Sequence, residues 1–225
     1  MGLQFMRPPT ALLAGLPPSA FDERRVLLRF QRRMDTAIAE LPRRVLYASA
    51  DGAGALLPAA GLDARPFGYH QRGCRRVVVN NGRDIGNVNE AEVAAVVRHV
   101  REFVSWAKAH PRSDGRAWEV AALSFYSAQE RALRRAMDQL GQAPRGVEIV
   151  VCTVDRFQGH EADVVALSFV KRHPTSFLQS RNRLNVALTR ARHLRMTIAH
   201  PDVFKCDEPL LAELAQEPSV IGGQS

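Results

Sequence analysis

The chain has 225 residues, 46% of them hydrophobic, and carries a formal net charge of +8 at pH 7, which fits one globular domain with irregular ends. No run of eighteen apolar residues occurs, and the start of the chain lacks the basic and apolar segments of a secretory signal, so we expect an intracellular protein with no membrane partner. The three cysteines and seven histidines form no Cys-x-x-Cys or His-x-x-x-His pair, so no metal site is expected.

Proline and glycine divide the first third of the chain. Residues 1–30 are expected to form an irregular or helical lead-in, with residues 22–34 the helical candidate. Residues 51–73 are rich in glycine, proline and small residues, which predicts a loop-rich surface segment. Three consecutive valines within residues 76–80 then indicate a buried strand.

From residue 87 onward, helical and strand-like patterns alternate. Residues 87–104 carry apolar residues at helical spacing, with Asn87 and Glu90 placed like a capping box. Further helices are expected at 127–140 and 183–192, and further strands at 120–125, 147–153, 163–170 and 194–199. This alternation predicts an α/β domain with a mainly parallel sheet between two helical layers. We place that domain at residues 31–205, followed by a C-terminal tail at residues 206–225.

Two motifs stand near the ends of the later strands. The run from Thr153 to Val165 leaves one strand, turns at Gln158-Gly159 and enters the next strand past Glu161. The second motif, at residues 185–192, reads Asn-Val-Ala-Leu-Thr-Arg-Ala-Arg. Because ligands of parallel sheets gather at the carboxyl ends of strands, we expect the run from Thr153 to Glu161, and residues 126–129 that leave another strand, to lie there. If neither motif binds a ligand, the first is a strand–turn–strand with polar residues in its turn, and the second is a basic helix at the surface.

Two shorter motifs lie upstream. Residues 31–34 read Gln-Arg-Arg-Met, and residues 123–129 read Leu-Ser-Phe-Tyr-Ser-Ala-Gln at a predicted strand-to-helix junction. A plain helix start, capped by Ser127 and with Tyr126 in the core, explains the second of these as well.

All four motifs resemble those of the second motor domain of superfamily 1 helicases, in the branch that includes the nonsense-mediated-decay RNA helicase. The resemblance covers residues 31–201 and implies a three-layer RecA-like domain of the P-loop NTPase type, without the half that carries the phosphate-binding loop. Arg32 stands where the family has a tyrosine that stacks on the base, although a guanidinium plane can also stack on a purine. Phe125 replaces the family's proline.

The resemblance also implies roles for individual residues. Arg190 corresponds to an arginine finger, a side chain that stabilises the charge developing on the transferred phosphoryl group, and Arg33 and Glu161 complete the same catalytic site. The residues implied to lie at the nucleotide are Gln31, Arg32, Gln158, Gly159 and Arg192. Those implied to contact nucleic acid are Thr153, Ser124, Tyr126, Gln129, Arg183 and Asn185.

The positive charge is concentrated in the last third of the chain. Residues 164–201 contain no Asp or Glu but seven Lys or Arg residues, which suits single-stranded DNA or RNA as a partner. The same charge is also compatible with a solvated surface, because 28 of the 31 basic residues are arginines and the chain is rich in them throughout.

The parts that hold ATP in such a motor are missing from this sequence. No Gly-Lys dipeptide occurs, so there is no Gly-x-x-x-x-Gly-Lys-Ser/Thr loop, and no acidic pair follows an apolar strand to hold Mg²⁺. We therefore expect ATP and Mg²⁺ to bind only when an N-terminal helicase half completes the site, and no ATPase activity from this chain alone. Three hypotheses follow: the C-terminal motor domain of an ATP-dependent helicase, a non-catalytic nucleic-acid-binding or partner module, and a remnant without activity.

Overall fold

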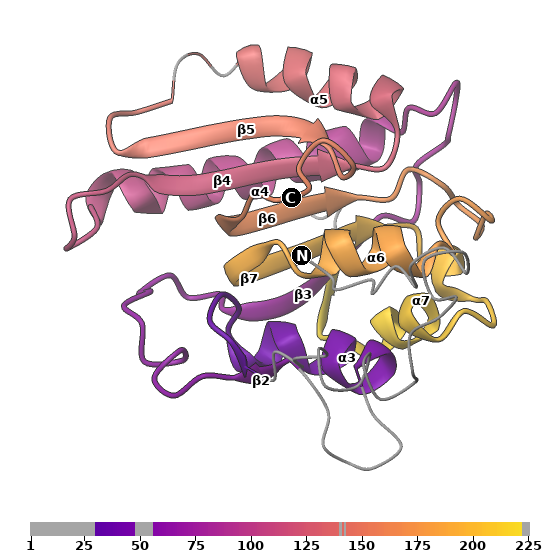
Figure 1. Cartoon of the computed structure of the whole chain (residues 1–225). Coiled ribbons are helices and arrows are strands. Elements are labelled where there is room, and N and C mark those ends of the chain that lie inside the picture. The colour runs from indigo at the N-terminus through magenta and orange to yellow at the C-terminus, as the bar shows by residue number, and fades with distance from the viewer. Residues whose placement is uncertain (1–29, 48–55, 140, 142, 222–225) are drawn as a thin grey trace, which may run out of the picture.

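Six parallel strands form the centre of the structure (Figure 1). The computed structural model describes residues 30–47, 56–139, 141 and 143–221. In spatial order the strands are β5 (Val147–Thr153), β4 (Trp118–Ser124), β6 (Ala162–Ser168), β7 (Ala191–Ala199), β3 (Gly73–Val78) and β8 (Ser219–Ile221), and every neighbouring pair is parallel. A second, two-stranded parallel sheet consists of β1 (Phe30–Gln31) and β2 (Leu57–Pro58). The predicted α/β class with a mainly parallel sheet is confirmed.

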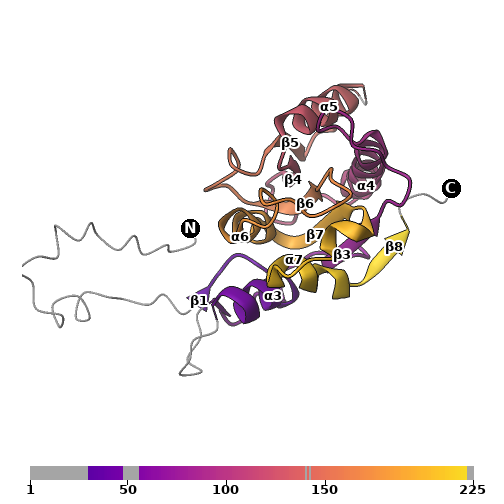
Figure 2. The same ribbon diagram turned by 90° about the vertical axis from the view of Figure 1, so that its right-hand side faces the viewer.

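Two layers of helices enclose the six-stranded sheet (Figure 2). The first layer consists of α4 (Glu90–Ala109) and α5 (Ser127–Asp138), and the second of α3 (Thr36–Leu46), α6 (Arg181–Leu188) and α7 (Pro209–Glu213). Two 3-10 turns, Pro201–Phe204 and Leu214–Gln216, flank α7. Among the helices in the described part of the chain, none has both the length and the apolar character needed to cross a bilayer.

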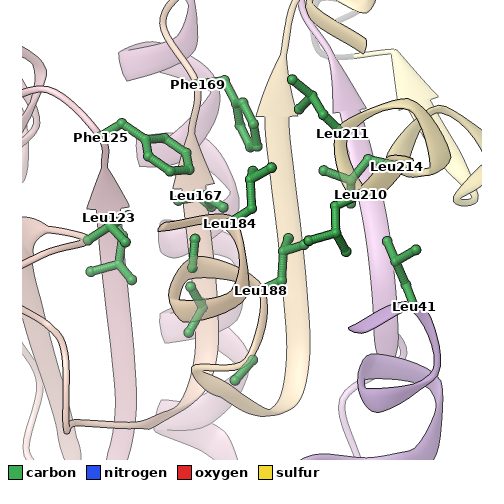
Figure 3. Packing of buried hydrophobic residues seen from close by; sticks show 14 of the residues in the cluster. Leu41, Leu123, Phe125, Leu167, Phe169, Leu184, Leu188, Leu210, Leu211 and Leu214 are labelled. Atoms are coloured by element: carbon green, nitrogen blue, oxygen red, sulfur yellow. The ribbon is translucent and has the colours of Figure 1, made fainter. Parts of the chain in front are cut away.

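Each face of the sheet has its own hydrophobic cluster. Successive side chains of β4 alternate between them, with Leu123 in the cluster under α6 and Ala122 in the cluster under α4. In Figure 3, Leu184 and Leu188 of α6 and the leucines of α7 lie together over the sheet beside Leu167. Because a buried leucine contributes roughly 1.5–3 kcal/mol relative to an exposed one, these contacts hold α6, and the motif that contains it, firmly on the sheet.

The start of α4 differs from the prediction by two residues. Asn89, and not Asn87, is the N-cap, and its Oδ1 accepts the backbone N–H of Glu92 at 3.2 Å. Asn87 has a positive φ of 62°, a left-handed conformation that Asn tolerates, and belongs to the preceding turn. The capping pair is therefore Asn89 and Glu92, and the predicted pair Asn87 and Glu90 is wrong.

The predicted helix at residues 22–34 is wrong where the chain is described. Residues 30–31 are strand, and residues 32–34 bend because the side chain of Gln31 folds back on them. Gln31 Oε1 accepts the backbone N–H groups of Arg33 at 2.9 Å and Met34 at 2.8 Å, and its Nε2 donates to Met34 O at 2.8 Å. The earlier residues of that prediction, and most of the predicted lead-in, lie outside the described part.

The helix predicted at residues 183–192 begins at Arg181 and ends at Leu188. Strand β7 starts at Ala191, because this stretch pairs with β6 on one side (Ala162 with Ala191) and β3 on the other. Arg190 and Arg192 are thus at the start of a central strand and not on a helix.

The C-terminal residues belong to the fold. Leu210 and Leu211 of α7 and Leu214 of the turn after it are fully buried, and β8 extends the sheet by pairing with β3. The division into lead-in, domain and tail remains a prediction, but residues 209–221 do not extend from the domain as a tail would.

Candidate functional site

The predicted functional residues lie at two opposite edges of the sheet. Because all six strands are parallel, their amino ends form one edge, the amino edge, and their carboxyl ends form the other, the carboxyl edge. Thr153 ends β5 at the carboxyl edge, whereas Glu161 immediately precedes β6 at the amino edge. The connection between them crosses the sheet face, where Val154 and Phe157 are buried in the hydrophobic cluster. The expectation that the whole run from Thr153 to Glu161 lies at the carboxyl ends is therefore wrong for Glu161. Arg190, which precedes β7, and Arg192, its second residue, also lie at the amino edge.

Three motifs meet at the amino edge through Glu161. Its Oε2 forms an ion pair with Nε of Arg33, a residue 128 positions away in the chain, and its Oε1 accepts Nε of Arg192 at 2.9 Å. Arg33 Nη1 also donates to the backbone carbonyl of Thr189 at 3.2 Å. The sequence motifs at residues 31–34, 153–165 and 185–192 are thereby joined in one cluster of charged side chains.

The charge of Glu161 is stabilised by its two arginines. Burial raises the pKa of this carboxyl, but the hydrogen bonds from Arg33 and Arg192 outweigh burial, and the pKa is lowered overall. Glu161 is therefore ionised at neutral pH. Since each of its oxygens already accepts an arginine N–H, Glu161 as arranged here is not a ligand for Mg²⁺.

A second carboxylate anchors this cluster beneath the surface. Asp163 is fully buried and accepts hydrogen bonds from Arg112 at 2.8 Å, from Arg192 at 3.1 Å and from the backbone N–H of Glu119 at 2.9 Å. Arg192 also bonds Glu119 Oε2 at 2.7 Å, so three carboxylates hold its guanidinium. Above it lies a hollow of about 410 Å³, whose lining residues are Arg32, Arg65, Pro66, Arg112, Asp114, Arg116, Glu161, Arg192 and His193.

Arg190 lies below this surface, with 2% of its area exposed. Its guanidinium donates to the backbone carbonyls of Val186 at 2.9 Å and His160 at 3.2 Å, and to Thr189 Oγ1 at 2.9 Å. Burial, together with the nearby charge of Arg33, lowers the pKa of Arg190 to about 10, which still leaves it positive at pH 7. The structure thus brings Arg190 close to Arg33 and Glu161 but does not expose it.

The remaining residues predicted at the nucleotide divide into two groups. Arg32 is exposed and lines the hollow, whereas Gln31 is buried and used in the turn described above. Gln158 and Gly159 are exposed away from the hollow, and Gly159 has a φ of +90°, which favours glycine. Gln158 borders a separate hollow of about 540 Å³ beside α6, which Asn185 and Arg183 also line.

Two residues predicted to touch nucleic acid are buried instead. Gln129 and Ser124 have no exposed surface, and Thr153 has only 9%. Gln129 accepts the backbone N–H of Asn89 at 2.9 Å and donates to Ser168 Oγ at 2.9 Å, and Ser124 Oγ donates to Ser168 O at 3.2 Å. In this arrangement Gln129 and Ser124 are not placed to contact a strand directly. They connect α5, the start of α4 and the end of β6.

The carboxyl edge exposes four other side chains in a row, and the sequence interpretation had singled out only two of them for nucleic acid. The rings of Tyr126 and Phe177 lie 5.3 Å apart, with Lys171 Nζ 4.9 Å from the Tyr126 ring and the guanidinium carbon of Arg183 4.1 Å from the Phe177 ring. Phe177 had not been singled out, and Lys171 had been counted only as a charge. The one available signal was an aromatic residue within the acid-free basic stretch.

Asn185 faces the edge of the hollow beside α6. Its Nδ2 donates to the hydroxyl of Tyr47 at 2.8 Å, while its Oδ1 is buried and, among the described residues, has no hydrogen-bond partner. Asn185 lines the same space as Arg183 and Gln158.

Comparison with known proteins decides the family. A family model described as an AAA domain matches residues 12–202. The chain belongs to this family. The Regulator of nonsense transcripts 1 homolog of Arabidopsis thaliana is 28% identical over 215 residues, covering 86% of this chain and 16% of that protein. An uncharacterized ATP-dependent helicase of Methanocaldococcus jannaschii is 39% identical over 83 residues, covering 37% of this chain and 12% of that protein.

The AAA-domain chain is thus a C-terminal, RecA-like domain of the superfamily 1 ATP-dependent helicases, in the branch of the regulators of nonsense transcripts. It spans less than a fifth of the length of both relatives. Among solved structures, the C-terminal domain of a possible DNA helicase from a Lactobacillus aligns over 86% of this chain and 99% of that one, with 16% identity and a TM-score of 0.47. That similarity is too low to carry an argument by itself.

Proposed function

We propose that this domain is the second motor domain of an ATP-dependent helicase and supplies the far side of the ATP site. In this proposal a domain with a Gly-x-x-x-x-Gly-Lys-Ser/Thr loop holds ATP and Mg²⁺ and docks against the amino edge. The observation that carries the proposal is the ion pair between Arg33 and Glu161, which joins two distant motifs at one surface. Arg192 completes the cluster through the same carboxylate.

The charges at the amino edge fit a polyphosphate approached from one side. Arg32 is exposed and Arg33 is a quarter exposed, so both guanidinium groups reach the surface that a docked domain would cover. Guanidinium groups bind phosphate oxygens through paired N–H donors in a fixed geometry. Glu161 orients Arg33 and Arg192 from behind. The carboxylates of Glu119, Glu161 and Asp163 at this edge are all engaged by arginine side chains, so in this proposal the docked domain supplies the phosphate loop and the metal ligands.

Arg190 requires one further step in this proposal. Its N–H groups bond the carbonyls of Val186 and His160 in the isolated domain, so docking of the triphosphate has to draw it outward. A guanidinium with two neutral carbonyl partners and a nearby Arg33 gains more from a phosphate than from those carbonyls, because the phosphate is charged. Such an arginine finger accelerates phosphoryl transfer by about 10³- to 10⁵-fold.

The carboxyl edge is proposed to hold a single strand of DNA or RNA. Thr153, Tyr126 and two basic residues of the acid-free stretch, Lys171 and Arg183, lie there, across the sheet from the phosphate-facing cluster. When the two motor domains close on ATP and open again, the contacts between this edge and the strand would change. Contacts of this kind are to the backbone and depend on salt more than on sequence.

We test whether this chain hydrolyses ATP without a second motor domain. Phosphate release by the purified chain is measured with Mg-ATP, in the presence and absence of a single-stranded oligonucleotide. We expect no turnover above that of a blank. Clear turnover that disappears in Arg190→Ala would show that this chain constitutes an ATP site alone, and would overturn the half-site proposal.

The burial of Arg190 favours one alternative, a module that binds nucleic acid and has lost its catalytic role. The two proposals differ in the presence of a phosphate-loop domain. Adding a phosphate-loop domain that docks on the amino edge should produce strand-stimulated turnover that Arg190→Ala abolishes if the motor proposal holds. Retained single-strand binding without any such turnover would favour the module.

A further inference from the structure

The row of side chains at the carboxyl edge forms one continuous stack. Lys171, Tyr126, Phe177 and Arg183 follow one another with separations of 4.9, 5.3 and 4.1 Å between their charged groups and ring centres. They come from three different segments: the start of α5, the loop after β6 and the first turn of α6. Tyr126 and Phe177 pack with one side against the hydrophobic cluster beneath them, and all four residues are partly exposed on the other side.

Partly buried hydrogen bonds hold Tyr126 in place, and a buried one holds the residue before Lys171. Tyr126 N donates to Ser124 Oγ at 3.3 Å, and its hydroxyl lies 3.4 Å from Thr175 Oγ1. Lys171 follows Val170, whose φ of 72° is rare for a β-branched residue, and Glu92 Oε2 accepts the backbone N–H of Val170 at 2.8 Å. A strained residue held by a buried carboxylate indicates a corner whose shape is fixed.

The two ends of the stack differ in how freely they can accept another group. Lys171 Nζ is bound to the side chains of Asp84 and Asn87, and only 19% of its side chain is exposed. Arg183 has 36% of its side chain exposed, and its contact with Asp155 is long, at 3.4 Å, to a carboxylate that is 60% exposed. The Arg183 end is therefore the open end.

We propose that an unpaired nucleobase of the bound strand stacks on the guanidinium of Arg183 and so extends this stack, an assignment that rests on the proposed single-strand binding. Nucleobases stack on guanidinium planes and on aromatic rings, and every base offers a flat face, so the contact tolerates any sequence. Phe177 supports the guanidinium from behind and keeps its plane oriented. The phosphates on either side of that base lie within the basic surface of the same edge. The domain thus contacts a base as well as the charged backbone.

Strands that differ only in their bases separate this stacking from phosphate binding. Affinity for a fluorescent oligothymidylate is compared with affinity for an abasic deoxyribose-phosphate strand of the same length and charge, at one low salt concentration. We expect the thymidylate strand to bind roughly 10-fold more tightly. In Phe177→Leu the two strands should bind within about twofold of each other, with abasic binding unchanged, because the guanidinium loses its support. Phe30→Leu, which removes a ring that is 64% exposed elsewhere, should keep the full preference.

Each outcome is informative. Equal affinity of the unmodified chain for both strands, or a preference that survives Phe177→Leu, overturns the stacking and leaves single-strand binding intact. Absence of binding to either strand removes the proposed function as well. Should Phe177→Leu fail to fold by circular dichroism, Phe177→Trp replaces it: its fluorescence should change with the thymidylate strand and not with the abasic strand, relative to the unmodified chain. No difference between the strands in that variant overturns the proposal.

Discussion

The amino edge and the carboxyl edge of the sheet are built from different chemistry. At the amino edge Arg33, Arg192 and Arg112 are held by Glu161 and Asp163, so charge is balanced by charge. At the carboxyl edge the buried contacts are mostly between amides and hydroxyls, and the charged groups are stacked on rings at the surface. This difference indicates that an ionic network can hold several arginines in an orientation suited to binding an anion. A network of neutral hydrogen bonds chiefly fixes the shape of a surface.

Removing the buried carboxylate of the amino edge should have the largest effect on stability. Asp163→Ala leaves Arg192 and Arg112 without their shared partner and should lower the free energy of unfolding by about 3–5 kcal/mol, measured by urea denaturation. Asp155→Ala is the matched control, because Asp155 is exposed at the carboxyl edge and its loss should cost below about 0.5 kcal/mol. A cost below about 1 kcal/mol for Asp163→Ala would contradict the role of this residue as an anchor.

The glutamates of the two edges should respond to pH with opposite signs. Burial raises the pKa of Glu92 at the carboxyl edge from 4.5 to about 7. Between pH 4.5 and pH 7 the unfolded chain therefore loses this proton while the folded chain keeps it. The free energy of unfolding should fall by about 2–4 kcal/mol as pH rises through this range. The pKa of Glu161 is lowered, so its contribution is present above pH 4.5 and is lost as pH falls through its folded pKa.

Denaturation curves between pH 3 and pH 8 check both signs. Glu92→Gln should remove the decline between pH 5 and pH 7 and leave the acid limb in place. Glu161→Gln should weaken the acid limb alone. If Glu92→Gln retains the full decline, the burial of that carboxyl is not its cause.

The neutral network of the carboxyl edge should be sensitive to its central amide. Gln129→Ala strips partners from the backbone of Asn89 and from Ser168 and leaves a small cavity, which should cost about 2–3 kcal/mol. Gln158→Ala removes an exposed glutamine and should change the free energy of unfolding by less than about 0.5 kcal/mol. Equal effects of the two substitutions would mean that Gln129 is not a structural residue.

The smallest expected effect is that of salt on single-strand binding, a change of about 1.4 kcal/mol in binding free energy. Raising the salt concentration from 50 to 200 mM should weaken single-strand binding about 10-fold, as expected if roughly two to three phosphates are neutralised. Lys171→Ala, at the carboxyl edge, should reduce this dependence, whereas Lys108→Ala, in the last turn of α4 near the amino edge, should not. Fluorescence anisotropy measures both, and a salt dependence unchanged in Lys171→Ala would place the strand elsewhere.

Much of the fold could be predicted from hydrophobic spacing. Strand β5 has the predicted bounds, and α4 and α5 differ from theirs by a few residues at the ends, because periodic apolar patterns over ten or more residues are strong signals. The stretch around Arg190 was misjudged because Ala, Leu and Arg favour helices locally, while pairing with two neighbouring strands decides the outcome.

The sequence motifs located residues of the charged cluster but not their exposure. The resemblance implied one site of Arg190, Arg33 and Glu161; Glu161 pairs with Arg33 and Arg192, Arg190 is buried beside them, and their roles stay predictions. The burial of Gln129 and Arg190 depends on hydrogen bonds to residues far apart in the sequence or to backbone carbonyls, which no local pattern encodes. Phe177 lies in an irregular loop, where a single ring has no periodicity to reveal its orientation.

Strand β6 connects the two edges directly. All seven of its residues are buried between β4 and β7, and at about 3.3 Å per residue it spans roughly 20 Å from Ala162, next to the anchored carboxylates, to Ser168, next to the stack. A strand packed on both faces and hydrogen-bonded on both sides bends very little. The strand therefore acts as a spacer that keeps the anchored carboxylates and the aromatic row at a fixed separation.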